Sequence, residues 1–166
     1  MERFYRNIMK IGNLKKFQVK VKETDLLIFS EKNIKKEIEK EVIKQRKIIE
    51  DYISQHPEFH LSFSPIDVES KEEIINLMSI SSKLTKTGPM ASVAGAISEI
   101  VGKKFLSISP QILIENGGDI FMNLKNEVKI SIYAGNSPFS MKIGIKVKGE
   151  NSIGIATSSG TVGHSF

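Results

Sequence analysis

The chain has 166 residues, of which 40% are hydrophobic and 26% are charged, as expected for one globular domain with its own core. It contains no cysteine, which excludes disulfides, thiolate metal sites and a cysteine nucleophile. The formal net charge is +5, but lysines and glutamates are mixed over residues 31–47, so we expect no nucleic-acid partner. No apolar run approaches membrane-spanning length, so we expect a cytoplasmic protein without a membrane partner.

The first part of the chain is predicted to form a hairpin and a long helix. Residues 17–22 alternate apolar and polar side chains, and the segment 25–29, apolar after Asp25, follows a short turn, so the two segments should pair. Ser30 is expected to cap the helix and Pro57 to end it. The helix should face the sheet with an apolar stripe, made of Ile34, Ile38, Val42, Ile49 and Ile53.

Two histidines near the end of that helix have the spacing of a helical zinc pair. His56 and His60 are four residues apart, but Pro57 interrupts them and no glutamate occupies the HExxH position. Histidines on the surface or in a loop are therefore the better interpretation than a metal site.

Two further helices are predicted in the middle of the chain. The first covers residues 70–80, and the second begins after Gly88 and Pro89 and is expected to stop at Gly102. The first half of the second helix is unusually small, with Ala91, Ser92, Ala94, Gly95 and Ala96. Small side chains allow either tight packing of the helix on a sheet or close approach of a flat ligand.

The second half of the chain is predicted to be an antiparallel meander. Its apolar runs are residues 112–114, 120–124, 128–133, 143–147 and 153–155. A turn with Asn116 and Gly117 at its centre would join the first two runs. That turn does not require Gly118 or Asp119, whose bare backbone and carboxylate also suit a ligand site, so a turn alone and a turn with a site both remain open.

Two more loops have a composition that suits a polar ligand. Residues 133–139 end a strand in Gly, Asn, Ser and Pro, and the last residues, 152–166, place hydroxyls and glycines after a short apolar run. A flexible tail is the alternative for the last segment. If these loops, the turn at Asn116 and the small-residue helix start meet, they would form the walls of one pocket.

The order of these motifs resembles that of the ApbE-like superfamily and, more closely, of the UPF0280 family within it. The resemblance rests on Gly88–Gly95, Glu115–Asp119 and Ile155–Gly160, followed by His164. It implies an α+β fold, with a two-layer antiparallel sheet, helices packed on one face and a relation to the T-fold, as a single domain over residues 1–166. In the FMN transferases of this superfamily, the same motifs surround FAD and magnesium.

By this resemblance, specific residues would hold a flavin or another nucleotide-like ligand: Gly88, Ala91, Ser92, Asn116, Gly117, Gly118, Asp119, Thr157, Ser158, Ser159 and Gly160. Asp119 would bind magnesium and His164 would be the acid or base. The chain departs from the transferases at Met90, Ala91 and Ser92, where they carry a lysine and acidic residues. It also ends at Phe166, before the helical segment that supplies further metal ligands in the family.

These departures leave two hypotheses for the function. One is an enzyme with magnesium-dependent FMN transfer or nucleotide cleavage, and the other is a binding module that holds a flavin or pterin without turning it over. An exposed strand edge near the C-terminus also predicts a homo-oligomer, or association with the missing C-terminal segment. The abundance of Lys, Glu and Ile favours a thermophilic source.

Overall fold

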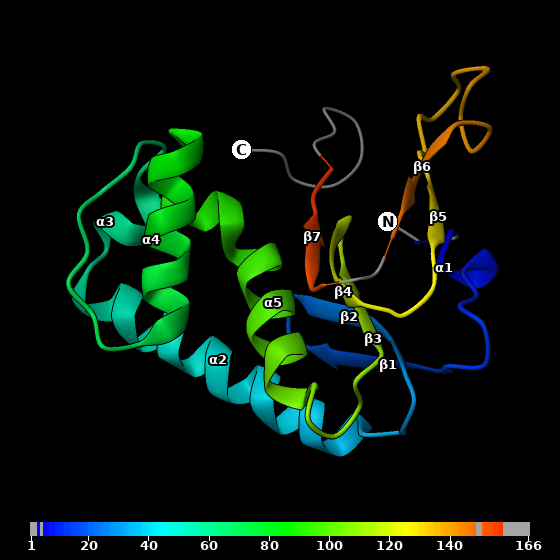
Figure 1. The fold of residues 1–166 in the computed structure, drawn as a ribbon. Coiled ribbons are helices and arrows are strands. Elements are labelled where there is room, and N and C mark those ends of the chain that lie inside the picture. The colour runs from blue at the N-terminus through cyan, green and yellow to red at the C-terminus, as the bar shows by residue number, and fades with distance from the viewer. Residues whose placement is uncertain (1–2, 4, 149–150, 158–166) are drawn as a thin grey trace.

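The fold is an antiparallel sheet with helices on one face and a smaller layer on the other (Figure 1). It is seen in a computed structural model that describes residues 3, 5–148 and 151–157. After the short helix α1 (Tyr5–Ile8), the predicted hairpin is present as β1 (Lys15–Val21) and β2 (Thr24–Ser30). These two strands pair over their whole length, which confirms the expected hairpin.

Within the described residues, the main sheet has five strands in the order β1-β2-β3-β4-β7. Its second half consists of β3 (Ile112–Asn116), β4 (Asp119–Asn123) and β7 (Ile153–Ile155). Strand β3 pairs with β2, although the helices separate the two strands in the sequence. All pairs in this sheet are antiparallel, so the predicted α+β class with an antiparallel sheet is confirmed.

The prediction of one continuous meander is wrong. Strands β5 (Val128–Ser131) and β6 (Gly144–Val147) form a separate two-stranded sheet, and β7 takes the place beside β4. The base of this hairpin buries Val128, Ile130 and Val147 against the back of the main sheet. Alternation reveals which face of a strand is apolar, but it does not reveal which edge the strand joins.

The helical layer is built from α2 (Lys35–Gln55), α3 (Glu58–Leu61), α4 (Glu73–Thr85), the 3-10 helix η1 (Pro89–Ser92) and α5 (Val93–Phe105). The predicted stripe of α2 faces the main core, with Ile38 and Val42 fully buried. Ser30 does not cap α2, because it is the last residue of β2 and its hydroxyl donates to the Lys32 carbonyl at 2.5 Å. Gly102 does not end the third long helix, which continues to Phe105.

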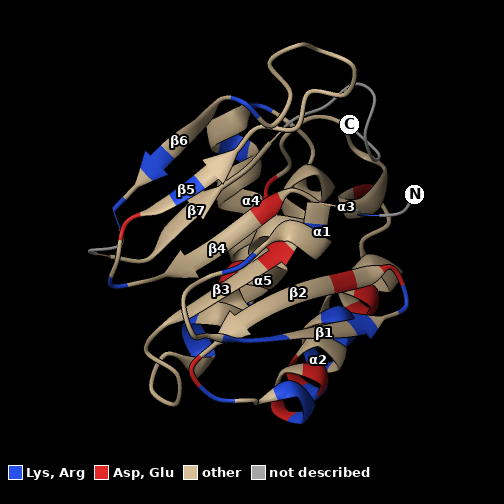
Figure 2. Ribbon diagram, turned by 90° about the vertical axis from the view of Figure 1, so that its right-hand side faces the viewer, with Lys and Arg blue, Asp and Glu red and all other residues tan. Residues whose placement is uncertain are grey.

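The other face of the sheet is covered by a second, smaller core. Sheet residues Leu27, Phe29, Leu113 and Met122 are buried there, and the segment before β1 packs on them through Met9, Ile11 and Leu14. Figure 2 shows the β5–β6 hairpin beside this sheet, with lysines on both of its strands. The sheet is therefore covered on both faces, and its polar residues need partners on each side.

Candidate functional site

Three segments that are far apart in the sequence meet at the start of α5. The side chain of Asn116 donates from Nδ2 to the Ala94 carbonyl at 3.1 Å, and the Gly95 N–H donates to the Asp119 carboxylate. The Thr157 hydroxyl donates to the Gly118 carbonyl at 3.3 Å. We call this meeting point, formed by Ala94, Gly95, residues 116–119 and Thr157, the α5 junction.

The alternation of the strands explains why the junction forms on the helical side. Asn116 is the last residue of β3 and pairs with Asp119, the first residue of β4. Paired residues point to the same face of a sheet. Since Ile114 and Phe121 belong to the core under the helices, Asn116 and Asp119 also point toward α5.

The turn between β3 and β4 uses two glycines at its centre. Gly117 has φ +66° and Gly118 has φ +109°, the positive values that a type I′ turn needs at both central positions. The expectation of an Asn116–Gly117 centre is therefore wrong by one residue. Gly118 is required by the turn, whereas Asn116 is free to bind α5 with its side chain.

Gly118 is further constrained by what surrounds it. A Cβ at this position would lie 2.7 Å from the Thr157 hydroxyl oxygen, so a side chain here would displace the Thr157 hydroxyl from the turn. Its N–H donates to Glu115 Oε1 at 3.0 Å. This N–H is thus engaged by a carboxylate on the opposite face of the sheet.

Asp119 is the ionisable group of the junction. Burial raises the pKa of its carboxyl, the charge of Glu115 adds to this rise, and the hydrogen bond from the Gly95 N–H opposes it. A carboxylate that has lost solvent in this way gains from any cation placed beside it. Together with the Thr157 hydroxyl and the Gly118 carbonyl, Asp119 offers the oxygen ligands that magnesium prefers.

A buried ionic cluster supports the turn from the other face of the sheet. Glu115 is 1% exposed and accepts from Arg6 Nε at 2.6 Å and from the Tyr5 hydroxyl at 2.8 Å. Arg6 also donates from Nη1 to Asp25 Oδ1 at 2.8 Å. This cluster was not predicted from the sequence, although a glutamate within an otherwise apolar strand signals a buried cation nearby.

The pKa values of the cluster follow from these contacts. Burial and the hydrogen bond to Glu115 raise the pKa of the Tyr5 phenol to about 12. Burial acts to raise the pKa of Asp25, but hydrogen bonds from Gln18 and Arg6 outweigh it, so the pKa is lowered. The cluster is consequently ionised at Asp25 and neutral at Tyr5 over the physiological range.

The first part of the small-residue segment lies apart from the junction contacts. Gly88 and Ala91 line a hollow of about 140 Å³ together with His60, Phe63 and Met90 among others. A Cβ on Gly88 would lie 1.8 Å from the Ser62 carbonyl oxygen, so this glycine allows two backbone segments to touch. The Ser92 hydroxyl donates to the Pro89 carbonyl at 3.0 Å, within its own turn.

Several predicted site residues lie outside the described part of the chain. These are Ser158, Ser159, Gly160 and His164. The predicted fourth wall, residues 133–139, is at the tip of the β5–β6 hairpin, far from the start of α5 (Figure 1). The described junction therefore unites the helix start, the turn and Thr157, without that loop.

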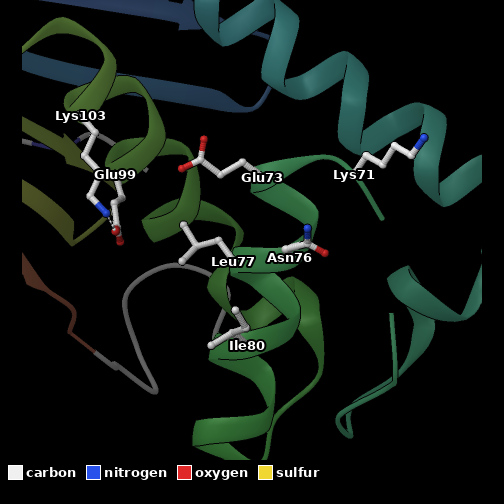
Figure 3. A pocket seen from close by; sticks show the side chains of 7 residues that line it. All are labelled: Lys71, Glu73, Asn76, Leu77, Ile80, Glu99 and Lys103. Carbon is white, nitrogen blue, oxygen red and sulfur yellow. Dashed lines mark hydrogen bonds and ion pairs between the residues drawn. The ribbon is translucent and has the colours of Figure 1, made fainter. Parts of the chain in front are cut away.

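Another hollow, of about 380 Å³, lies between α4 and α5. Figure 3 shows Leu77 and Ile80 on α4 facing this space, with Glu99 and Lys103 on α5 beside it. Lys103 is ion-paired to Glu99 at 2.5 Å. No residue that lines this hollow was predicted as a site residue.

The described residues hold no group of three or more His, Asp or Glu side chains arranged to bind a metal. His56 stacks on Tyr52 with ring centres 4.4 Å apart and contacts Glu58 at 3.4 Å, in keeping with a structural role for this histidine. Within the same described ranges, no helix combines the length and the apolar character needed to cross a bilayer.

Comparison with known proteins places the chain in a family. The family model described as "AbpE bacteria" matches residues 6–166. A UPF0280 protein of Methanocaldococcus jannaschii is 42% identical over 155 residues, which are 90% of this chain and 63% of that protein. The chain belongs to the UPF0280 family. This confirms the narrower of the two resemblances seen in its motifs.

Other UPF0280 proteins are similar to the chain at comparable levels. The protein of Methanococcus vannielii is 40% identical over 89% of this chain and 62% of its own length. That of Methanothermobacter thermautotrophicus is 39% identical over 75% of this chain and 49% of its own length. The chain thus spans about half to two thirds of the length of these curated relatives.

Proposed function

We propose that this UPF0280 chain binds a flavin or a similar nucleotide-like ligand at the α5 junction, as an ApbE-like protein with a T-fold-like scaffold. The observation that carries the proposal is the convergence of Ala94 and Gly95, the Asn116–Asp119 turn and Thr157. The motifs on which the superfamily resemblance rests are thus neighbours in space.

Space beside the junction supports the proposal. Gly154 in β7 pairs with Phe121 in β4, so its missing side chain would point to the helical face. No described atom lies within 4 Å of the position that a Cβ on Gly154 would occupy. A planar ring could lie on β7 here, beside α5, with its polar edge toward Thr157 and Asp119.

The junction would hold the ligand through a small number of groups. The start of α5 supplies the positive end of the helix dipole, which favours a phosphate. Asp119, Thr157 and the Gly118 carbonyl fit a magnesium ion, which would neutralise phosphate charge near the carboxylate. Asn116 holds α5 and β3 at a fixed distance through its bond to Ala94, and so keeps these groups in place.

Binding without turnover is the alternative that the described residues favour. At the junction, Asp119 is the described carboxylate on the helical face, whereas Glu115 faces the other side and is ion-paired with Arg6 at 2.6 Å. Phosphoryl transfer generally relies on several groups that stabilise the developing charge. Release of AMP from FAD in the presence of magnesium would assign the chain to the catalytic alternative.

Calorimetric titration with FMN and FAD, with and without magnesium, tests the proposal. We expect saturable binding, and at a hundredfold excess over Kd a gain in stability of about 2.7 kcal/mol in thermal unfolding. Asp119→Asn should weaken magnesium-dependent binding by at least about tenfold, since it removes the charge beside the cation. Asp67→Asn is the matched control, because Asp67 is an exposed carboxylate on the surface.

Either of two outcomes would contradict the proposal. One is the absence of heat and of any thermal shift with FMN, FAD and AMP at millimolar concentration. The other is equal weakening by Asp67→Asn and Asp119→Asn, which would show that the measured binding does not involve the junction. If Asp119→Asn unfolds the chain, Thr157→Val provides a second variant, because it removes only the hydroxyl that contacts Gly118.

A further inference from the structure

Exposed large hydrophobic side chains gather at two ends of the molecule. On the β5–β6 hairpin they are Ile132, Phe139, Ile143 and Ile145, which are 41–61% exposed. At the α3–α4 end they are Leu61, Phe63, Ile80 and Leu84, which are 57–80% exposed. Figure 1 shows these ends on opposite sides of the sheet. Clustered apolar exposure of this kind marks interaction surfaces.

The hairpin is amphipathic along its whole length. Its apolar face begins at Val128 and Val147, which pack on the main sheet, and continues to Ile132 and Ile143 beyond the sheet. Lys129 and Lys146 pair across the two strands on the opposite face. An isolated two-stranded ribbon is marginally stable, so the part of the apolar face beyond the sheet would gain from a partner.

The two ends carry opposite charge. Residues 127–148, which we call the basic hairpin, contain four lysines and one glutamate. Residues 58–84, which we call the acidic end, contain five acidic residues and two lysines. The acidic residues are Glu58, Asp67, Glu69, Glu72 and Glu73. Each end therefore combines exposed apolar side chains with a charge that complements the other end.

We propose that two copies of this chain associate head to tail, with the basic hairpin of one copy seated on the acidic end of the next. The charge complementarity favours this arrangement over contact between two hairpins, which would bring eight lysines together in one dimer. The same complementarity favours a second copy of the chain over a lipid surface as the partner of the hairpin, since the chain itself carries the acidic end. A head-to-tail contact repeats, and so forms a ring or a filament.

Sedimentation velocity of the 166-residue chain over a hundredfold concentration range tests the proposal. We expect the average mass to rise with concentration and to fall as salt is added. Lys142→Glu with Lys148→Glu reverses charge on the hairpin, and Glu69→Lys with Glu72→Lys reverses it on the acidic end. Each double variant alone should associate at least tenfold more weakly than the wild type.

A mixture of the two double variants gives the sharpest result. The reversed hairpin of one variant complements the reversed end of the other, and the remaining two surfaces are wild type, so mixing should restore assembly. Lys36→Glu with Lys40→Glu, two exposed positions on α2, is the matched control and should leave assembly unchanged. Circular dichroism of every variant confirms that each is folded.

Several outcomes would overturn the proposal. A monomer at all concentrations would do so, as would a mixture that stays dissociated. Loss of association in the hairpin variant alone would indicate a symmetric hairpin dimer. Binding to anionic vesicles that depends on Lys142 and Lys148, without self-association, would assign the hairpin to a membrane surface. None of these outcomes depends on flavin binding, so they test this proposal separately from the proposed function.

Discussion

Gly102 of α5 packs directly on Phe121 of the sheet, and Gly102→Ala should therefore destabilise the fold. A Cβ at this position would lie 2.1 Å from Cδ1 and 2.3 Å from Cε1 of Phe121. Carbon atoms prefer a separation of about 3.5–4 Å. Phe121 is 3% exposed and lies in the core, so its ring would have to shift against packed neighbours to admit the methyl group.

The magnitude follows from two opposing effects. Replacing glycine by alanine inside a helix normally stabilises by about 1 kcal/mol, whereas forcing an extra methyl group into a packed core costs about 1–3 kcal/mol. The overlap at Phe121 is severe, so we expect a net loss of about 1–2 kcal/mol. For a chain of this size, that loss lowers the thermal midpoint by about 2–8 °C.

Gly95 is the matched control in the same helix. A Cβ at Gly95 would lie 3.5 Å from Asp119 Oδ2, which is an ordinary contact, so Gly95→Ala should be neutral or stabilising by up to about 1 kcal/mol. Urea unfolding measures both variants, and Phe121→Leu in the Gly102→Ala background should recover part of the loss. If Gly102→Ala is as stable as Gly95→Ala, the reasoning about this contact is wrong.

Three further predictions concern the buried ionic cluster. Arg6→Met leaves Glu115 buried without its cation and should cost about 3–5 kcal/mol in urea unfolding; a cost near zero would contradict the pairing. The pKa of Tyr5 is raised to about 12 in the fold. The stability of the wild type relative to Tyr5→Phe should therefore be highest below about pH 10 and should fall as the pH rises toward 12. A stability difference that stays constant with pH would refute this. Because the pKa of Asp25 is lowered, wild-type stability relative to Asp25→Asn should be lost as the pH falls below about 4, which an acid series of unfolding midpoints measures.

Local patterns predicted the parts of the fold that depend on neighbours in sequence. Alternation over residues 17–22 and 25–29 gave the β1–β2 hairpin, and the isoleucine spacing from Ile34 gave the buried face of α2. The same patterns could not show that β5 and β6 leave the main sheet, because their alternation is compatible with either edge. That difference depends on which apolar surface remains available after the other strands have paired.

Some residues of the candidate site were predicted from the sequence, whereas others were revealed only by the structure. Asn116 and Asp119 of the junction were predicted as site residues from the sequence. At the helix start, however, the predicted residues were Gly88, Ala91 and Ser92, whereas the contacts of the junction are made by Ala94 and Gly95. The role of Gly118 in the turn and the close approach of Gly102 to Phe121 could not be predicted from the sequence, since both depend on backbone angles and distances. The pairing of Glu115 with Arg6 joins residues 109 positions apart, and no local pattern indicates which cation a buried glutamate will meet.

The most direct test of the proposed function is an amide NMR titration of the chain with FMN in the presence of magnesium. The account predicts shifts that saturate and that are largest at Gly95, Gly118 and Thr157, the backbone positions of the α5 junction. Shifts confined to Leu77 and Ile80 in the hollow between α4 and α5, or no shift at saturating ligand, would contradict it.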